Sequence, residues 1–520
     1  MVGQLSFRVI AVALSAALLA GCSLSQNAAP RIELPQQVRL PQNDLAALLE
    51  RRSGRIAIVD DDGNVVITDQ TGRSTVTITR EGNAGAANAS SGPYVTTYNW
   101  PMWSPDGRRL ALIEVVAQRP AVSAVIEYGV DEIIVRRGRE SRTIIVGAQG
   151  QLASSAPNTQ YRVTQPNRVV IEPATGSANL VYNALYVTDA DGKSPLIEVH
   201  ASEDNWIRYL NWSPDGSRLA FVSEDIRTGQ VSLNVDSVEP PNQPARRLFN
   251  GASAAWHWSP DGATLLARVR LTPTSTLPVL SMFDVAGNGR PTILSSGSVL
   301  AFFSPQLSPD GQRILTTIDE GNRSYLAVMD RQGKLIRRLT EFQGAVSFAW
   351  SPAEERVAYI TRQSPQQSGG VLRLVDVNSG EDKVLTDQPV IGFFWAPDGR
   401  RIAAFSPMQP SDITPDLPGI DYTSSQPGTV LMLHTIDVNT RNARQIAYFE
   451  PTEEFLSLIT QFDVFSRSMN IWSPDSTKLV FPLQVTTRQG PLDVIFQTEA
   501  SGSITPRFIG LGALAFWSPK

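Results

Sequence analysis

Apolar and polar residues alternate over short runs along most of the chain. Runs such as "RLAFVS" from Arg218, "YLAVMD" from Tyr325 and "RIAAFS" from Arg401 have the period of two that is typical of β-strands. Residues that favour turns, mainly Gly, Pro, Asp and Asn, separate these runs. The pattern therefore predicts an all-β fold of many short strands joined by tight turns.

One motif, "WSPDG" or a close variant, recurs at the start of these strands. Successive copies are 109, 46, 49, 43, 45, 77 and 45 residues apart, so the basic unit has about 45 residues and two intervals contain insertions. A unit of this length accommodates four antiparallel strands, which is the size of a propeller blade. One copy opens with Leu307, and the others open with the tryptophans that we expect to anchor the repeats: Trp103, Trp212, Trp258, Trp350, Trp395, Trp472 and Trp517.

The motif has the chemistry of a hairpin turn. Pro sets φ at the first corner, Asp bonds back to the local backbone, and Gly takes the left-handed conformation that reverses the chain. Two copies depart from it, "WSPAEE" at Trp350 and "WSPDST" at Trp472. We expect these two turns to be altered and their blades to be kept.

The repeats resemble the WD-like PD40 repeats of TolB-type proteins and of the propeller in dipeptidyl peptidase relatives. The resemblance covers roughly residues 53–520 and implies a β-propeller of four-stranded antiparallel blades. It implies little about activity, because propellers carry many unrelated functions.

The two ends of the chain complement each other. Residues 53–81 contain three strands that no "WSPDG" precedes, whereas the C-terminal "ALAFWSP" is a motif opening without its strands. Pairing of the two would complete one composite blade and remove open sheet edges. With seven complete units, this predicts an eight-bladed propeller closed by its N- and C-terminal strands.

The N-terminus resembles that of a bacterial lipoprotein. Arg8 precedes a short apolar run that ends in "LAGC", a lipobox whose cysteine, Cys22, is the only one in the chain. We expect a signal peptide over residues 1–21 and fatty acyl chains, palmitate among them, on Cys22. An incidental thiol is the alternative. Residues 22–52 form a Pro-containing tether with a possible short helix, and residues 53–520 the propeller.

Three segments interrupt the repeat. Residues 117–182 are either a β excursion from the first blade or a degenerate extra blade, and we favour the excursion. Residues 407–429 form a Pro-rich loop that either carries binding or is a tolerated surface insertion. The segment "EPTEEFLSLITQFDVFS" from Glu450 has helical spacing, and we expect it to pack over one rim.

Composition excludes some classes of function. The net charge is −5 with acids and bases interspersed, which argues against a nucleic-acid-binding surface. The three histidines, His200, His257 and His434, are far apart in sequence, and no Gly-x-Ser-x-Gly motif is present. "DDDGN" at Asp60 and "DADG" at Asp189 fit hairpin turns better than calcium loops. We therefore predict no catalytic, cofactor-binding or metal-binding residues.

The sequence favours a lipid-anchored, extracytoplasmic propeller of the cell envelope that acts as a binding or scaffold module. A protein or an envelope polymer would bind at a rim or at the channel mouth. TolB-like proteins are periplasmic partners of envelope lipoproteins, but this chain carries its own lipobox, so we do not transfer their partners to it. The alternative is a propeller glycan hydrolase or lyase, whose carboxylates would converge near the channel at separations of roughly 5 to 9.5 Å.

Overall fold

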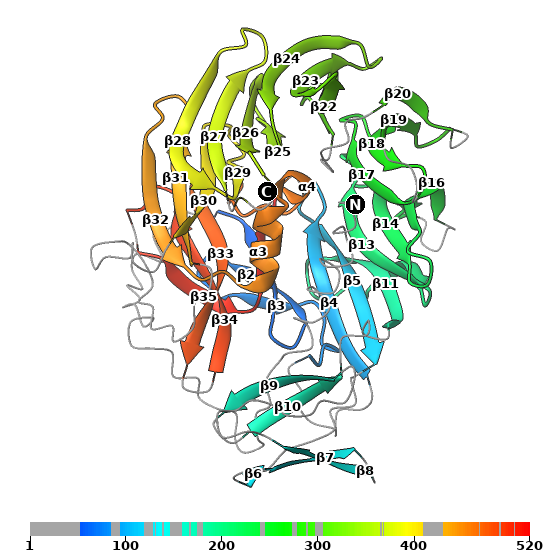
Figure 1. Ribbon diagram of the computed structural model, residues 1–520, viewed down its shortest axis with the longest axis vertical. Helices are drawn as coiled ribbons and strands as arrows, with labels where there is room; N and C mark the ends of the chain where they lie inside the picture. Colours follow the sequence, from blue (N-terminus) through cyan, green and yellow to red (C-terminus); the bar gives the residue numbers. More distant parts are fainter. Residues whose placement is uncertain are drawn as a thin grey trace.

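Eight sheets stand around a common centre in the computed structural model (Figure 1). The structure describes residues 53–84, 94–118, 180–239, 245–272, 278–287, 290–296, 305–364, 367, 369–408, 430–466, 468–487, 490–503 and 505–520, and the backbone of five strands between residues 128 and 173. The predicted eight-bladed propeller is confirmed. The predicted signal peptide, Cys22, the tether and its helix, and most of the 407–429 loop lie outside the described residues.

Each blade begins with an inner strand and proceeds outward. Blade 1 is composite and consists of β36 (Leu514–Trp517), β1 (Arg55–Val59), β2 (Val65–Asp69) and β3 (Thr75–Thr77). Blade 2 consists of β4 (Tyr94–Trp103), β5 (Arg109–Gln118), β11 (Leu180–Asp189) and β12 (Ile197–Ser202). Blade 3 consists of β13 (Asn205–Trp212), β14 (Arg218–Asp225), β15 (Val231–Ser237) and β16 (Arg246–Gly251). Blade 4 consists of β17 (Ser253–Trp258), β18 (Thr264–Arg270), β19 (Val279–Asp284) and β20 (Thr292–Ser296).

The second half of the ring repeats this order. Blade 5 consists of β21 (Gln306–Leu307), β22 (Arg313–Glu320), β23 (Arg323–Asp330) and β24 (Leu335–Phe342). Blade 6 consists of β25 (Ala345–Trp350), β26 (Arg356–Arg362), β27 (Gly370–Asp376) and β28 (Asp382–Val390). Blade 7 consists of β29 (Gly392–Trp395), β30 (Arg401–Met408), β31 (Val430–Asp437) and β32 (Ala443–Phe449). Blade 8 consists of β33 (Lys478–Thr487), β34 (Gly490–Glu499) and β35 (Arg507–Leu511), and a bridge between Trp472 and Leu479 takes the place of its inner strand.

The ends of the chain close the ring as predicted. Strand β1 pairs antiparallel with β36, with Ile56 opposite Trp517 and Val59 opposite Leu514. The amide of Arg55 also donates to the Ser518 hydroxyl at 3.1 Å. Because β36 supplies the inner strand and β1 to β3 the outer three, the strands at both ends of the propeller are paired within one blade.

The motif turns have the geometry that their residue types favour. In blade 2 the Ser104 hydroxyl donates to Asp106 at 2.6 Å, and Gly107 has a φ of 71°. In the "DST" copy Ser476 occupies the glycine position with a φ of 60°, so the turn survives at some cost in backbone strain. The "AEE" copy closes differently, with the Arg356 amide donating to the Glu354 carbonyl, and its blade is kept.

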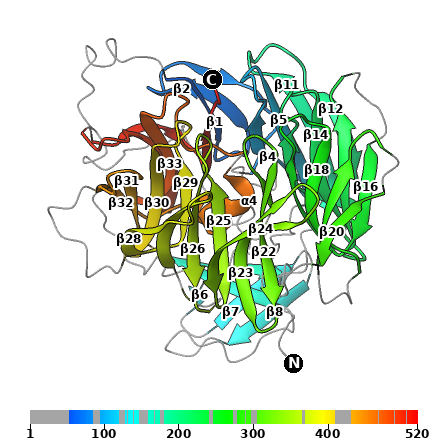
Figure 2. The ribbon, with the colours of Figure 1, turned by 90° about the horizontal axis from the view of Figure 1, so that it is seen from above.

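Antiparallel order gives the ring two unlike rims. All motif turns lie at one rim, which we call the turn rim. The opposite rim, which we call the loop rim, contains the connections between the second and third strands of each blade and those between blades. Strand β5 pairs directly with β11, and the chain between them forms two separate small sheets that Figure 2 shows on the side away from the C-terminus. These sheets contain β6 (Tyr128–Gly129), β7 (Glu132–Arg137), β8 (Glu140–Ile145), β9 (Thr159–Gln165) and β10 (Arg168–Pro173).

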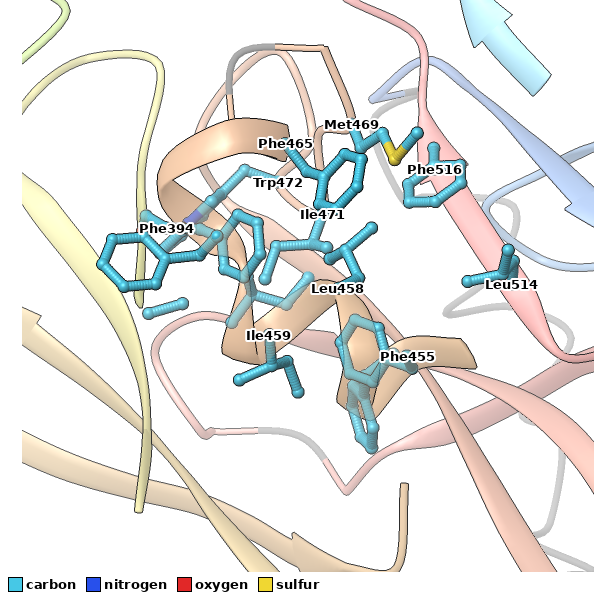
Figure 3. Packing of buried hydrophobic residues seen from close by; sticks show 14 of the residues in the cluster. Phe394, Phe455, Leu458, Ile459, Phe465, Met469, Ile471, Trp472, Leu514 and Phe516 are labelled. Carbon is cyan, nitrogen blue, oxygen red and sulfur yellow. Dashed lines mark hydrogen bonds between the residues drawn. The ribbon is translucent and has the colours of Figure 1, made fainter. Parts of the chain in front are cut away.

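The helical segment after β32 forms α3 (Glu453–Thr460) and α4 (Phe462–Phe465). Thr452 caps α3 by accepting a hydrogen bond from the Phe455 amide. We expected this segment over one rim, but the two helices lie in the middle of the ring (Figures 1 and 2), against β25, β29 and β33. The reason is the apolar face that Phe455, Leu458 and Ile459 present to the inner strands, where all three are buried (Figure 3). We call α3 and α4 the plug.

Candidate functional site

The repeat tryptophans join each blade to the one before it. At five of the eight seams between blades, the indole N–H of the motif tryptophan donates a hydrogen bond to a backbone carbonyl of the previous blade. The acceptor is always the residue just before that blade's own motif. The bonds run from Trp103 to Phe516 (3.2 Å), Trp212 to Met102 (3.0 Å), Trp258 to Asn211 (3.3 Å), Trp395 to Ala349 (3.2 Å) and Trp472 to Phe394 (3.0 Å).

The other three seams use different bonds. Between blades 8 and 1, the Trp517 amide donates to the Asn470 carbonyl at 2.8 Å. Between blades 5 and 6, the Gln306 side chain accepts from the Trp350 amide at 2.9 Å. Between blades 4 and 5, where Leu307 replaces the tryptophan, the Leu307 amide donates to His257 Nδ1 at 3.0 Å. Among the described residues, the indole N–H groups of Trp350 and Trp517 have no hydrogen-bond acceptor.

Arginines at the turn rim cover several of these tryptophans. The Arg109 guanidinium lies 5.3 Å from the Trp212 ring centroid and donates to the Gly216 carbonyl at 2.7 Å. Arg401 lies over Trp472 in the same way, at 5.6 Å. Each such arginine crosses to the motif turn of the next blade and adds a cation–π contact to the seam. The turn rim is therefore built mainly of repeated structural contacts.

The plug reaches several blades through aromatic side chains. Phe465 stacks on Trp100 of β4 with ring centroids 5.4 Å apart, and it meets Tyr209 of β13 edge-on at 5.2 Å. The Tyr209 hydroxyl donates to the Val464 carbonyl at 3.1 Å. Trp100 has a φ of 54°, which is uncommon for a bulky residue. Blades 2 and 3 thus hold the plug on the side opposite its contacts with β25 and β29.

Carboxyl groups from three elements influence one another through their charges. They are Asp61 in the turn between β1 and β2, Glu454 in the first turn of α3, and Asp493 on β34. Burial raises the pKa of Glu454 to about 7, and the charges of Asp493 and Glu453 add to the shift. The pKa values of Asp61 and Asp493 are raised too, chiefly by desolvation, and Gln484 donates to Asp493 at 3.0 Å. The charges of these groups therefore act on one another.

A further carboxyl group lies inside the plug itself. Asp463 of α4 is buried, and burial raises its pKa to about 7, although the positive charge of Arg362 on β26 opposes the shift. The folded protein binds a proton at Asp463 and at Glu454 more tightly than the unfolded chain does. Stability is therefore highest when these groups are protonated and falls as the pH rises from about 4 through about 7.

We accordingly expect the melting temperature to fall between pH 5.5 and pH 8, and Asp463→Asn to make that fall shallower. A shift of about three units corresponds to about 4 kcal/mol at most, and about half of it is already lost at pH 5.5, so the variant should gain stability at both pH values and more at pH 8. Thermal unfolding across this pH range measures it, with Asp387→Asn on the exposed face of β28 as control. An unchanged slope in Asp463→Asn would contradict the assignment.

The histidines and acidic turns do not form a common site. His200, His257 and His434 lie in blades 2, 4 and 7, and burial lowers the pKa of His434 to about 4. Asp60 begins the turn between β1 and β2, as predicted, and Asp191 lies in the turn between β11 and β12. Within the described parts of the chain, no three His, Cys, Asp or Glu side chains are arranged to hold a metal ion.

Sequence reasoning missed both the plug's place in the centre and the carboxyl groups whose charges interact. Asp61 and Asp493 are near opposite ends of the chain and interact because ring closure brings blades 1 and 8 together. The one feature of the sequence that pointed to these groups was the acidic pair Glu453 and Glu454 at the start of a helix. Acidic residues are common at helix N-termini in any case, so the pair did not indicate a site.

Comparison with known families identifies the repeat. Residues 159–402 match the model of the TolB beta propeller domain, PD40. The repeats within this region are therefore similar to PD40 repeats of the TolB-like type. The matched PD40 region extends from β9 to the start of β30 and includes blades 3 to 6 completely.

Individual relatives match a smaller part of the chain. The Tol-Pal system protein TolB of Xylella fastidiosa (strain M12) is 32% identical over 88 residues, which are 17% of this chain and 19% of that protein. The TolB of Xanthomonas campestris pv. campestris (strain B100) matches to the same extent. The chain thus aligns with about a fifth of the length of these relatives.

Solved propellers are similar at low identity. An oligogalacturonate lyase in complex with manganese has a TM-score of 0.40 and 12% identity, and the match covers 58% of this chain and 75% of the lyase. TolB from Acinetobacter baumannii has a TM-score of 0.33 and 15% identity, with 69% and 84% covered. The propeller domain of the Trilobed protease from Pyrococcus furiosus has a TM-score of 0.40 and 10% identity, with 80% and 97% covered.

Proposed function

We propose that this protein is a lipid-anchored binding or scaffold propeller of the cell envelope, with its partner, a protein or an envelope polymer, bound at the loop rim. The observation that carries the proposal is the plug. Its buried apolar side chains pack against the inner strands in the middle of the ring, which favours the rims as the surfaces for a partner. Long loops on rigid scaffolds often carry binding, and the connections interrupted by insertions open at the loop rim.

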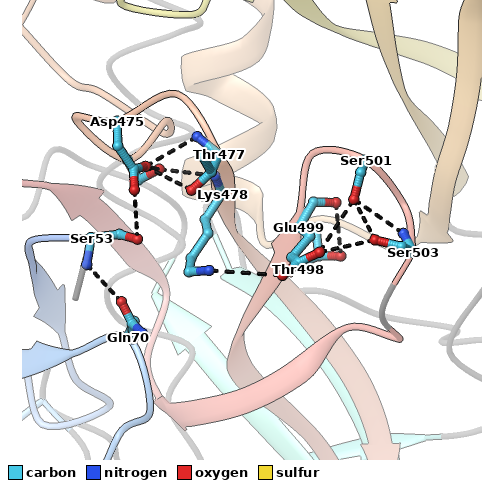
Figure 4. Close-up of polar contacts among 10 residues, drawn as sticks. Ser53, Gln70, Asp475, Thr477, Lys478, Thr498, Glu499, Ser501 and Ser503 are labelled. Carbon is cyan, nitrogen blue, oxygen red and sulfur yellow. Dashed lines mark hydrogen bonds and ion pairs between the residues drawn. The ribbon is translucent and has the colours of Figure 1, made fainter. Parts of the chain in front are cut away.

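The attachment point of the tether supports this orientation. Ser53, the first described residue, donates from its hydroxyl to Asp475 in a motif turn at 2.9 Å, and its amide donates to Gln70 at 2.8 Å (Figure 4). The chain before Ser53 therefore leaves from the turn rim. A lipid anchor at Cys22 would therefore attach the propeller to the membrane from the turn rim, and the loop rim would stay accessible to a partner.

Envelope location is supported by the relatives, which are Tol-Pal system proteins, and by the lipobox. In the part of the chain that the structure describes, no helix has the length and apolar character needed to cross a bilayer.

The anchor has a direct test. We expect Cys22→Ser to abolish incorporation of labelled palmitate and to leave the precursor unprocessed, because the chain has no other thiol. Metabolic labelling and membrane fractionation measure both effects. Equal labelling of the variant and the wild type would contradict lipidation at Cys22.

Site-specific photocrosslinking tests the proposed rim. Ile226 lies in a turn of blade 3 at the loop rim, and Ile336 lies at the start of β24 near the turn rim. They are a matched pair, because their exposed fractions are 47% and 53%. We expect a photoreactive residue at position 226 of the intact lipoprotein to capture the envelope partner and one at position 336 to capture none. Capture at position 336 alone would overturn the proposal.

The interacting carboxyl groups Asp61, Glu454 and Asp493 favour a second candidate, a glycan hydrolase or lyase. Glycoside chemistry needs two carboxyl groups with different proton affinities. Release of reducing ends from envelope glycans by the wild type, lost in Glu454→Gln, would support this candidate over the binding module.

A further inference from the structure

The seam between blades 4 and 5 differs chemically from the other seven. At each of the other seams, the described hydrogen bond of the inner strand joins indole, backbone or carboxamide groups, none of which changes its charge near neutral pH. This seam is bridged from the Leu307 amide to the imidazole of His257. We propose that the seam between blades 4 and 5 is a pH-sensitive junction of the ring, closed while His257 is neutral and loosened when His257 is protonated.

The direction of the bond makes the junction sensitive to protonation. Nδ1 of His257 accepts a hydrogen from the Leu307 amide over 3.0 Å, and a ring nitrogen accepts only when it carries no proton. In the imidazolium both ring nitrogens are donors, so two N–H groups would face each other across the seam. Histidine is the side chain that ordinarily changes its charge between pH 5 and pH 8.

The described apolar contacts of this seam come from aliphatic side chains and methionine. Among the residues that the structure describes, its buried cluster contains Leu266, Leu280, Leu307, Ile314 and Met329, none of them aromatic. The cluster between blades 3 and 4 contains two tryptophans and two phenylalanines in addition to aliphatic residues. Among the described side chains, the seam between blades 4 and 5 therefore has less aromatic burial than its neighbour.

Other charged groups of the seam come from both blades. Arg268 on β18 donates to Thr317 on β22 at 2.8 Å, and the charge of Asp319 on β22 acts on it. Burial lowers the pKa of Arg268 to about 10, so it stays charged throughout the range in which histidine titrates. Arg331, in the turn after β23, reaches Thr264 of blade 4 at 3.5 Å. Among these described groups, the imidazole is the one whose ordinary pKa lies between pH 5 and pH 8.

Hydrogen exchange of the wild-type protein at pH 7.5 and pH 5 tests the proposal. After correction for the intrinsic exchange rate, we expect the protection of the Leu307 amide to fall about fivefold or more at pH 5, as the loss of one hydrogen bond implies. The Trp517 amide is the internal control. It donates to a backbone carbonyl across the seam between blades 8 and 1, so it should keep its protection at pH 5.

Two variants separate the imidazole from other effects of acid. In His257→Asn the Oδ1 atom can accept in place of Nδ1 and does not titrate, so the Leu307 amide should stay protected at both pH values. His200→Asn, in blade 2, should respond as the wild type does. Equal protection of Leu307 at both pH values in the wild type would overturn the proposal, and so would the same acid loss in His257→Asn. Should His257→Asn fail to fold, the wild-type comparison of Leu307 with Trp517 still decides.

Discussion

Removal of residues 512–520 is expected to leave a protein that aggregates or melts far below the intact chain. The deletion takes away β36, and with it the buried Leu514, Phe516 and Trp517. Each large apolar side chain contributes about 1.5 to 3 kcal/mol, against a typical total stability of about 5 to 15 kcal/mol. The deletion also removes the Phe516 carbonyl that accepts from Trp103, so the seam between blades 1 and 2 loses its bond.

The matched control is truncation at the other end. Removing residues 1–42 takes away part of the segment before Ser53 and none of the described propeller, so the melting temperature should hardly change. Circular dichroism and size-exclusion chromatography of the two purified truncations make the comparison. If the C-terminal deletion melted like the full chain, the stability of the ring would not depend on its closure.

Replacing a fully buried repeat tryptophan should have the second largest effect. Trp472 has no exposed surface, donates to the Phe394 carbonyl at 3.0 Å and lies beneath Arg401. Trp472→Ala removes all three interactions and leaves a cavity, so we expect a loss of about 3 to 5 kcal/mol in the free energy of unfolding. Trp472→Phe keeps a ring in place and should lose less, including about 1 kcal/mol for the hydrogen bond.

Chemical denaturation measures these differences. Trp206→Ala is the control, because Trp206 is partly exposed at the start of β13 and contacts Arg208 of its own strand. Its replacement should cost about 1 kcal/mol or less, as is usual away from the core. Equal losses for Trp206→Ala and Trp472→Ala would mean that the seam bonds contribute nothing special to stability.

The sequence was informative about blades because the blade is a local unit. Pro, Asp and Gly set the turn within five residues, and alternation places one face of each strand inward, so the repeat and its count follow from neighbours along the chain. Closure of the ring could also be predicted from the sequence. The motif at Trp517 has no strands after it, and the strands that follow Ser53 have no motif before them, so each supplies what the other lacks. The lipobox at Cys22 and the boundaries of the tether and the insertions stay predictions.

The tertiary structure alone decided what lies between blades and in the centre. A periodic pattern marks Phe455, Leu458 and Ile459 as one helical face but does not say which surface buries it. Asp61 and Asp493 acquire raised pKa values only because ring closure brings distant segments together and excludes water from them. His257 became the acceptor for Leu307 because a neighbouring blade presents an amide there. Such contacts depend on how whole blades pack, and hydrogen-bond partners in different blades leave no spacing rule in the sequence.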